Sequence, residues 1–255
     1  MLRQPNEAQA MPDDSPRKTL LLTGASRGIG HATVKRFDRE GWRVISCSRQ
    51  PFDPRCPWGG AENHIQIDLA DPSAIFEAID AIRERLGGRL DALVNNAGIS
   101  PKGEGGARLD TLTTDLATWN HVFNVNFFAS VLLARGLRKE LATARGSVVN
   151  VTSIAGARVH PFAGAAYATS KAALAALTRE MAHDFGPLGV RVNAIAPGEV
   201  ETSILSPGTE KIVETLPLRR LGQPSEVADL IWFLCSDQSS YISGAEIEVN
   251  GAQHV

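Results

Sequence analysis

The sequence predicts an α/β protein: one Rossmann-type domain in which a doubly wound parallel sheet carries helices on both faces. Three observations support this prediction. Short apolar or β-branched runs alternate with longer amphipathic runs from Thr19 onward, a glycine-rich turn follows the first apolar run, and 255 residues suffice for one large core. Strands that alternate with helices of about ten or more residues need right-handed crossovers, which pair the strands in parallel and cover both faces.

Each expected strand is a short run rich in β-branched or apolar residues. In chain order these runs are 19–23, 43–48, 65–68, 92–95, 146–152, 191–196 and 246–249. The expected helices are the longer amphipathic stretches at 28–40, 72–86, 115–141, 166–185 and 225–235. Because ligands of such sheets bind at the carboxyl ends of the strands, the residues just after each strand are the first candidates for a site.

Two connections lack helical periodicity and are predicted to be surface loops near the ligand edge. Residues 50–64 contain three prolines and a Gly-Gly pair, which argue against a helix but leave enough chain to join two parallel strands. Phe52 and Trp58 are expected to pack against the sheet there. Residues 101–114 contain three glycines and follow the fourth expected strand.

Composition and charge argue against several classes of function. The formal net charge is −2, the pI is about 6.3, and basic and acidic residues are interspersed, so no surface for nucleic acid or an anionic membrane is expected. Cys47, Cys56 and Cys235 show neither CxxC spacing nor an even disulfide framework. This pattern indicates a reducing compartment and argues against a structural zinc site.

No segment of the chain is predicted to enter a membrane. Residues 1–18 are polar and lack an apolar core, which favours a disordered extension over a secretory signal or an anchor. No apolar run reaches the roughly 18 residues needed to span a bilayer. The expected location is the cytoplasm, with the catalytic domain at residues 19–255.

A glycine-rich turn follows the first expected strand and opens the first expected helix. In the run TGASRGIG, Gly24, Gly28 and Gly30 have GxxxGxG spacing rather than the GxGxxG spacing of many dinucleotide sites. Gly24 permits a tight turn, Gly28 a close approach to a pyrophosphate, and Gly30 close packing of the helix on the strand. An ordinary turn is the alternative, but the position between strand and helix favours a phosphate site.

The end of the second expected strand favours NADP over NAD. An NAD site usually places an Asp or Glu there to bind the ribose 2′-hydroxyl, whereas this chain has Ser48 and Arg49. Together with Ser26 and Arg27 of the glycine turn, the Arg49 guanidinium is suited to a 2′-phosphate through charge-assisted hydrogen bonds. The alternative is that Arg49 is a solvated loop residue.

A tyrosine and a lysine are spaced as an acid/base pair on one helix face. Tyr167 and Lys171 are four residues apart in an alanine-rich stretch, a spacing that also occurs on ordinary solvated helices. Ser153 follows the fifth expected strand, and Asn126 lies in the third expected helix. The alternatives are that Ser153 caps the strand end and that Asn126 is a satisfied polar core residue.

Several motifs in this order resemble the short-chain dehydrogenase/reductase family. They are TGASRGIG, Asp68, the run Asn95-Asn96-Ala97-Gly98, Ser153, the YxxxK pair, and the run NAIAPG followed by Thr202. The resemblance extends from Thr19 to Gly251 and implies a catalytic set of Asn126, Ser153, Tyr167 and Lys171. The expected cofactor-binding residues are Gly24, Ser26, Arg27, Gly28, Ile29, Gly30, Ser48, Arg49, Asp68, Leu69, Asn95, Ala97, Gly98, Tyr167, Lys171, Pro197, Gly198, Val200 and Thr202.

The resemblance also implies roles for individual cofactor residues. Asp68 is expected near the adenine, and Asn95 is expected to steady the sheet centre and the cofactor ribose. Thr202 and the Pro197-Gly198 turn are expected to hold the nicotinamide carboxamide. Lys171 is expected to hydrogen-bond the nicotinamide ribose, with Asn126 holding a water in a proton relay to Lys171.

Reduction of a ketone needs a hydride on carbon and a proton on oxygen. The cofactor supplies the hydride. A free tyrosine has a pKa of about 10, and we expect the Lys171 ammonium and the oxidised nicotinamide to favour the Tyr167 phenolate, which makes the phenol a usable acid/base. Ser153 is expected to donate a hydrogen bond to the substrate oxygen. No GxSxG motif surrounds Ser153, so a hydrolase nucleophile is not indicated.

The substrate is less closely defined by the sequence. The pocket is expected between 154–166, the segment after Gly98, and a substrate loop at 199–216, with His160, Phe162 and Glu199 as candidate contacts. For each of these three, packing or solvent exposure is the alternative. Glu199 indicates a polar substrate unless it faces water.

Among activities of the family, the chain is similar to 3-oxoacyl-acyl-carrier-protein reductases. Acyl carrier protein is acidic, and related reductases often have a basic residue before the glycine that matches Gly189, where this chain has Leu188. A small ketone, sugar, polyol or steroid-like substrate is therefore the alternative. A third hypothesis is an NADP-binding sensor without turnover, against which the complete acid/base set argues.

A homotetramer is expected from helix surfaces. Ala168, Ala172, Ala175 and Ala176 form a small-residue face on the Tyr167 helix, and the third expected helix carries the run Val131-Leu132-Leu133. By the family resemblance, these helices pair across a two-fold axis, and residues 245–249 form another interface. Packing within the chain is the alternative.

Overall fold

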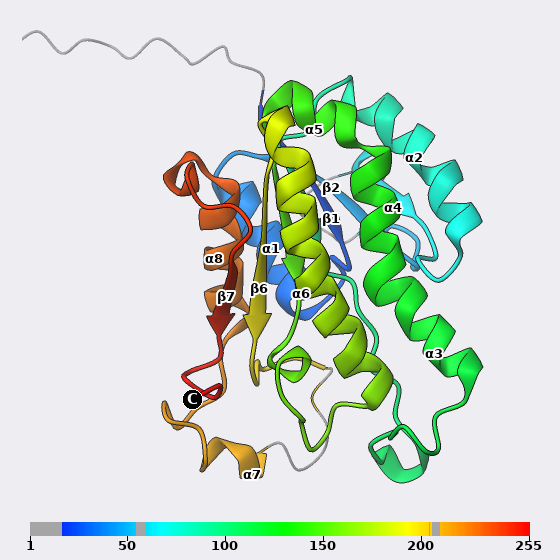
Figure 1. Ribbon diagram of the computed structural model, residues 1–255. Helices are drawn as coiled ribbons and strands as arrows, with labels where there is room; N and C mark the ends of the chain where they lie inside the picture. Colours follow the sequence, from blue (N-terminus) through cyan, green and yellow to red (C-terminus); the bar gives the residue numbers. More distant parts are fainter. Residues whose placement is uncertain (1–16, 55–59, 204, 206–209) are drawn as a thin grey trace, which may run out of the picture.

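The computed structural model describes residues 17–54, 60–203, 205 and 210–255 and confirms the predicted fold class. A parallel sheet of seven strands has the order β3-β2-β1-β4-β5-β6-β7 (Figure 1). The strands are β1 (Thr19–Thr23), β2 (Arg43–Ser48), β3 (His64–Gln66), β4 (Ala92–Asn95), β5 (Ser147–Val151), β6 (Arg191–Pro197) and β7 (Glu246–Val249). The order reverses direction between β1 and β4, which creates a crevice at the carboxyl ends of these strands.

Helices cover both faces of the sheet. On one face lie α1 (Gly28–Arg39) and α8 (Pro224–Cys235); on the other lie α2 (Pro72–Leu86), α4 (Ala129–Gly136) and α6 (Ala165–Phe185). The remaining helices are α3 (Leu116–Phe123), α5 (Arg138–Ala144) and the short α7 (Glu210–Val213).

Alternate residues of the central strand point to opposite cores. Leu21 of β1 packs in the cluster that contains Ile75 and Leu133, whereas Leu20 packs in the cluster that contains Phe37. All five of these side chains are at most 1% exposed. Burial on both faces explains why β1 reads as a continuous apolar run rather than an alternating one.

The third expected helix is interrupted, which corrects the predicted continuous helix at 115–141. The chain forms α3, a π-helical turn at Asn124–Phe128, α4, and then α5 after a break at Leu137. Asp115 caps α3 by accepting a hydrogen bond from the Thr118 backbone N–H at 2.6 Å. π-helical turns of this kind occur frequently at functional sites.

The third strand is shorter and earlier than the predicted 65–68. It ends at Gln66, because Asp68 turns the chain: its carboxylate accepts a hydrogen bond from the Ala70 N–H at 2.9 Å. In the preceding loop, Ala61–Asn63 forms a 3₁₀ turn, and the ring of half-buried Phe52 lies 6.1 Å from that of His64. Trp58, Cys56 and most of the predicted disordered extension lie outside the described residues.

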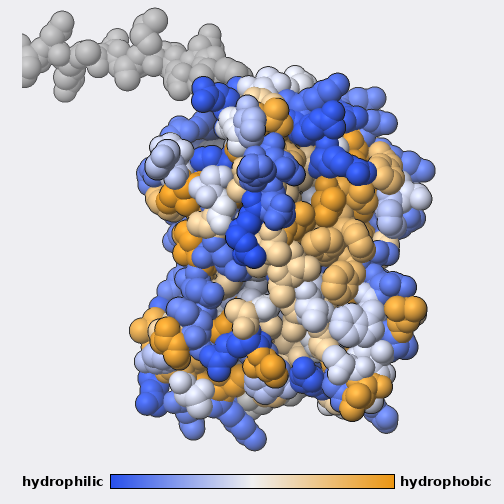
Figure 2. Space-filling model, in the orientation of Figure 1, coloured by the Kyte–Doolittle hydropathy of each residue, from blue (hydrophilic) through white to orange (hydrophobic). Residues whose placement is uncertain are grey.

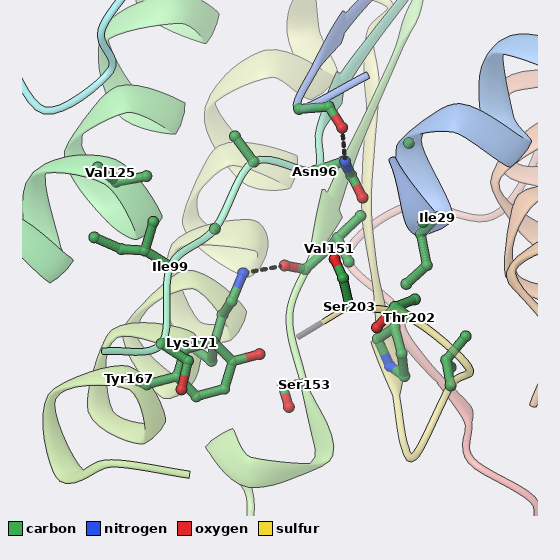
Figure 3. A pocket seen from close by; sticks show the side chains of 18 of the residues that line it. Ile29, Asn96, Ile99, Val125, Val151, Ser153, Tyr167, Lys171, Thr202 and Ser203 are labelled. Atoms are coloured by element: carbon green, nitrogen blue, oxygen red, sulfur yellow. Dashed lines mark hydrogen bonds between the residues drawn. The ribbon is translucent and has the colours of Figure 1, made fainter. Parts of the chain in front are cut away.

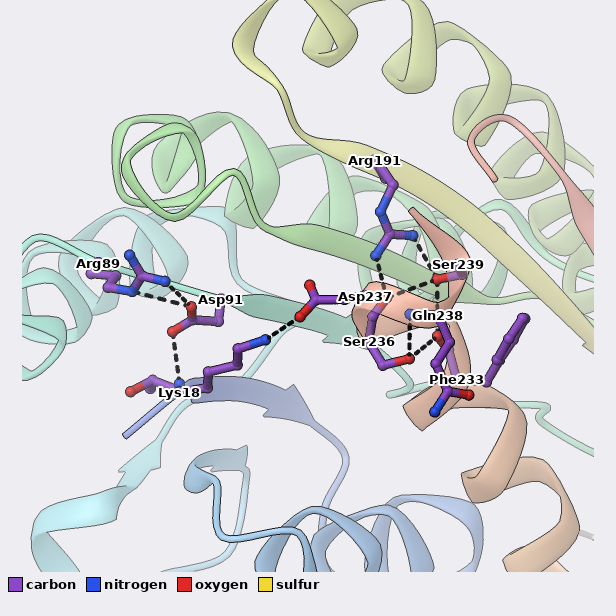
Figure 4. Close-up of polar contacts among 10 residues, drawn as sticks. Lys18, Arg89, Asp91, Arg191, Phe233, Ser236, Asp237, Gln238 and Ser239 are labelled. Atoms are coloured by element: carbon purple, nitrogen blue, oxygen red, sulfur yellow. Dashed lines mark hydrogen bonds and ion pairs between the residues drawn. The ribbon is translucent and has the colours of Figure 1, made fainter. Parts of the chain in front are cut away.

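Polar contacts join the sheet to its surroundings at the amino ends of the strands (Figure 4). Asp91, before β4, accepts a hydrogen bond from the Thr19 N–H at 2.9 Å and pairs with Arg89 at 2.6 Å. Arg191, the first residue of β6, donates to the backbone oxygen of Leu234 in the last turn of α8 and to that of Ser236 just after the helix. These contacts fix strand ends on the side of the sheet away from the crevice.

An apolar surface lies over the α4 and α6 side of the molecule (Figure 2). Phe128, just before α4, is 46% exposed, and Ala172 and Ala176 of α6 are exposed in the single chain. Within the described part of the chain, no helix has both the length and the apolar character required to cross a membrane.

Candidate active site

A cleft of about 300 Å³ lies at the carboxyl edge of the sheet, where the order of strands reverses (Figure 3). It brings together all predicted catalytic and cofactor-binding residues except Asn95 and Asn126. His160, Phe162 and Glu199, the candidate substrate contacts, also line it. The sequence analysis did not place Asn96 or Lys102 in the site, although Asn96 lies within a recognised motif and Lys102 within a loop expected at the ligand edge.

The glycine turn is shaped by close backbone packing. Gly24 has a φ of +71°, and a Cβ atom on Gly30 would lie 2.1 Å from the Gly24 carbonyl oxygen. Asn96 holds the turn from β4, since its side-chain amide donates to the carbonyl oxygens of Thr23 and Gly24, both at 3.0 Å. A Cβ atom at either position would clash, so glycine at both positions holds the start of α1 at the cleft, where its N–H groups can meet a dinucleotide phosphate.

The N-terminus of α1 opens into the cleft beside two arginines. Arg27 precedes α1, and no side chain caps the helix there. Arg49 follows β2, is exposed, and its guanidinium forms no hydrogen bond or ion pair with another residue that the structure describes. The helix N–H groups and both guanidinium groups therefore remain available for anionic oxygens.

Asn95 is placed inside the sheet rather than on the cleft wall. Its amide donates to the Asn150 side-chain oxygen at 2.8 Å, and Asn150 donates to the Thr178 hydroxyl at 2.9 Å. These three side chains are buried and join β4, β5 and α6. Asn95 therefore contributes to the sheet centre, whereas the neighbouring Asn96 lines the cleft.

Asn126 connects the π-helical turn to the segment after β4. Its side-chain oxygen accepts from the Ile99 N–H at 2.8 Å, and its amide donates to the Ile99 carbonyl and to the Ser170 hydroxyl, both at 3.0 Å. The residue is 1% exposed and lies behind the cleft wall. A Cβ on Gly98 would lie 3.6 Å from Asn126 Oδ1 and 3.3 Å from Lys171 Nζ, so both side chains border Gly98.

Tyr167 and Lys171 lie on one side of α6, facing the cleft (Figure 3). The Lys171 ammonium lies 5.8 Å from the centre of the Tyr167 ring and donates to the Val151 carbonyl oxygen at 2.6 Å. Burial lowers the pKa of Lys171 to about 8. Lys171 thus still carries its positive charge at neutral pH, although burial makes that charge more costly than in water.

The pKa of Tyr167 moves opposite to the sequence-based expectation. Burial raises the pKa of this phenol, a hydrogen bond with Ser153 opposes the rise, and the negative charge of Glu199 adds to it. Desolvation of the phenolate therefore dominates the pKa of Tyr167, which is a protonated phenol at neutral pH.

Ser153 both lines the cleft, as a catalytic residue would, and caps the turn after β5. It lies two residues after the end of β5 on the cleft wall, and its hydroxyl accepts a hydrogen bond from the Ala155 N–H at 3.2 Å at the start of the 3₁₀ turn Ile154–Gly156. Because the oxygen is used as an acceptor by the backbone, its hydrogen can be donated into the cleft, toward the Tyr167 phenol.

Comparisons with known proteins agree with this geometry. A family model described as Enoyl-(Acyl carrier protein) reductase matches residues 24–254. Protein FixR of Bradyrhizobium diazoefficiens is 60% identical over 250 residues, which cover 96% of this chain and 90% of that protein. A 3-oxoacyl-[acyl-carrier-protein] reductase of Thermotoga maritima is 35% identical over 247 residues, covering 92% and 96% of the two chains.

Among solved structures, an oxidoreductase of Brucella ovis in complex with a partially ordered NAD is 62% identical, with a TM-score of 0.81. It covers 92% of this chain and 100% of that one. Fold, cleft and relatives together define a nicotinamide-dependent oxidoreductase that acts on CH–OH and C=O groups. The chain belongs to the short-chain dehydrogenase/reductase family.

The buried amine of Lys171 predicts a pH-dependent cost to stability. Its pKa is about 8 in the folded chain, below the ordinary value of 10.5, so the unfolded chain binds more protons between these pH values. The cost is full below pH 8 and is relieved as the pH rises toward 10.5. We expect the stability of Lys171→Met relative to wild type to fall across this window by on the order of 3 kcal/mol.

Urea unfolding of both proteins at several pH values between about 7 and 10.5 measures this difference. Loss of the hydrogen bond to Val151 shifts the whole curve of the variant but not its slope. Exposed Lys139→Met is the control, and its difference from wild type should stay flat. Parallel pH curves for Lys171→Met and wild type would contradict the assignment.

Proposed function

We propose that this protein interconverts a carbonyl group and a secondary alcohol, with Tyr167 as the acid/base and Ser153 and Lys171 beside it. The observation that carries the proposal is the convergence of these three side chains in one cleft with the glycine turn. Gly24 packs against Ala97, and Gly30 packs against the Gly24 carbonyl so closely that a Cβ would clash; this packing holds the uncapped start of α1 at the cleft, where it fits the phosphates of a dinucleotide.

A nicotinamide cofactor, when bound, supplies or accepts the hydride. In the direction of reduction, the Ser153 hydroxyl donates a hydrogen bond to the carbonyl oxygen of the substrate, and the Tyr167 phenol donates its proton to that oxygen as negative charge develops. The raised pKa of Tyr167 keeps the phenol protonated before the reaction. In the direction of oxidation, the same phenol must first lose its proton.

Lys171 and Asn126 assist this proton transfer without contacting the reacting carbonyl group. The Lys171 ammonium stabilises negative charge on the phenol once the proton has left. Asn126 fixes the backbone of Ile99 and the hydroxyl of Ser170, the residue before Lys171. We propose that Asn126 thereby positions Lys171 and joins the proton path.

Replacement of Tyr167 by phenylalanine removes the acid/base and leaves the ring. We expect kcat to fall at least about 100-fold, because no other described side chain of the cleft replaces the proton at that position. Cofactor binding, measured by fluorescence titration, should remain within about twofold of wild type. A variant that keeps its activity would refute the assignment, and equal cofactor binding without turnover by wild type on any carbonyl would favour a sensor.

The preferred cofactor is proposed to be NADP(H). Arg27 and Arg49 line the cleft at the ends of β1 and β2, and Ser48 rather than a carboxylate ends β2. A carboxylate at that position would repel a 2′-phosphate, whereas two guanidinium groups attract it. The Brucella ovis relative was crystallised in complex with NAD, so the choice between the two cofactors needs a direct test.

Replacement of Arg49 by alanine separates the two cofactors. We expect the Kd for NADPH to rise about 10-fold to 100-fold, because the charge-assisted contact between Arg49 and the 2′-phosphate is lost. The Kd for NADH should change little. Exposed Arg39→Ala, at the far end of α1, is the control for general charge effects. Tighter binding of NADH than of NADPH by the wild type would reject the preference.

Two substrate classes remain candidates for this site. The Thermotoga maritima relative favours 3-oxoacyl thioesters, with acyl carrier protein as the partner. The polar residues His160 and Glu199 on the cleft wall favour a small polar ketone, sugar or polyol instead. Leu188, which stands where related reductases often have a basic residue, is 41% exposed and offers no charge to an acidic carrier protein.

We also propose a cytoplasmic location. Cys47 and Cys235 are buried free thiols, and burial raises the pKa of each to about 12. Such residues fit a reducing compartment. Subcellular fractionation tests this proposal.

We propose that the chain forms a homotetramer through the α4 and α6 surface. Exposed Ala172 and Ala176 permit close approach of a second helix, and Phe128 adds apolar area beside them. We expect Ala176→Glu to yield smaller species in light scattering, because it places a charge in the contact. Ala61→Glu, on an exposed turn after β2, should remain tetrameric. A monomeric wild type would exclude the proposed assembly.

A further inference from the structure

The substrate side of the cleft holds a buried polar pair that the proposed hydride transfer does not use. His160 and Glu199 are 8% and 9% exposed, and His160 Nε2 lies 2.6 Å from Glu199 Oε1. Both residues line the same cleft as Tyr167. A buried carboxylate beside an acid/base needs a partner that compensates its loss of water.

The hydrogen bonds of His160 define which ring nitrogen carries the hydrogen. Nδ1 accepts a hydrogen bond from the Phe162 backbone N–H at 3.3 Å, so in the neutral ring the hydrogen resides on Nε2. Despite the short distance to Glu199, Nε2 is a buried atom without a hydrogen-bond partner among the described residues. The pair is close, but its donor is not satisfied.

The charge of Glu199 reaches both sides of the substrate space. It raises the pKa of Tyr167 on one side. On the other side it partly offsets the lowering of the Lys102 pKa by burial. The Lys102 ammonium itself is engaged, since it donates to the Phe162 carbonyl oxygen at 2.5 Å. Glu199 therefore lines the same cleft as the reacting phenol and acts on it electrostatically.

The position of Glu199 is fixed by its backbone. Its carbonyl oxygen accepts from the Gly222 N–H at 2.9 Å, and its own N–H donates to the Gln253 side-chain oxygen at 3.3 Å. Val200 forms a parallel bridge with Gly222. These contacts hold the segment after β6 against the cleft, so the carboxylate is presented by an anchored chain.

We propose that Glu199 and His160 form a subsite for a substrate hydroxyl group next to the reacting carbonyl carbon. The hydroxyl hydrogen is donated to the Glu199 carboxylate on the cleft wall, and His160 positions this carboxylate from its buried side, where Nε2 lies 2.6 Å from Oε1. The inference rests on the proposed function and assigns its substrate class: small hydroxyketones and the corresponding diols or polyols.

Other substrate groups fit this subsite less well. An ammonium group would share the cleft with the Lys102 ammonium, which repels it. A substrate carboxylate would be repelled by Glu199. The methylene next to the carbonyl of a 3-oxoacyl thioester cannot donate a hydrogen bond, so it would leave the Glu199 carboxylate without a donor from the substrate.

The test compares 3-hydroxy-2-butanone with 2-butanone, which differ by one hydroxyl next to the carbonyl. We expect the wild type to favour the hydroxyketone in kcat/KM by about 10-fold to 100-fold, as sites built to bind a hydroxyl do. In Glu199→Leu this ratio should fall toward one. Glu199→Gln, which keeps the shape and removes the charge, should give an intermediate ratio and guards against misfolding of the leucine variant.

A second readout separates the subsite from a purely structural role. Because Glu199 raises the pKa of Tyr167, its replacement by glutamine should move the alkaline limb of the kcat/KM profile for reduction to lower pH. Loss of packing alone would lower the rate without this shift. An unshifted limb together with an unchanged substrate ratio would overturn the proposal.

The remaining outcomes are also decisive. Equal turnover of both ketones by the wild type, or a preference for the acetoacetyl thioester of N-acetylcysteamine, overturns the hydroxyl subsite while the proposed hydride transfer stands. If the wild type reduces no carbonyl, the proposed function fails, and calorimetric titration of the NADP⁺-loaded protein with 2,3-butanediol and 2-butanol decides the subsite. Tighter binding of the diol that is lost in Glu199→Leu supports it, and equal binding overturns it.

Discussion

The contact between the β1–α1 turn and the end of β4 is the constraint on which the rest of the structure depends. Asn96 bridges the two by donating to the Thr23 and Gly24 carbonyl oxygens, and Gly30 packs against the same carbonyl of Gly24. These contacts sit where the strand order reverses, so they join the two halves of the sheet at its carboxyl edge. The start of α1 keeps its place at the cleft because backbone packs on backbone at this point, where a Cβ atom would clash.

Burial determines the pKa values of Tyr167 and Lys171 more strongly than the spacing of the two residues on α6 does. It raises the pKa of Tyr167 and lowers that of Lys171 to about 8, so both groups are biased toward their neutral forms. A neutral phenol is suited to donate a proton to a carbonyl oxygen. The same burial makes the phenolate costly, so proton abstraction from an alcohol depends on the positive charge that an oxidised nicotinamide brings to the cleft.

Much of the fold was predictable because its strands are buried on both faces. Runs such as Leu20-Leu21-Leu22 can only be accommodated between two helical layers, and the glycine turn marks the first crossover. The break in the third expected helix was not predictable, because the π-helical turn is tied to Asn126 and its hydrogen bonds to Ile99, a contact between distant segments. The effect of burial on the pKa of Tyr167 was not anticipated for a similar reason, since spacing on a helix indicates a neighbour but not how deeply a side chain is buried.

In the proposed subsite, substrate recognition and acid strength are coupled through Glu199. Its carboxylate acts on the phenol through space, so a hydrogen bond donated to the carboxylate by the substrate disperses that negative charge and reduces its effect on Tyr167. The phenol then becomes a stronger acid only when the matching substrate is in place. Binding of the substrate hydroxyl, which does not react, would therefore assist proton transfer from Tyr167. In this way, substrate groups remote from the reacting bond can raise kcat.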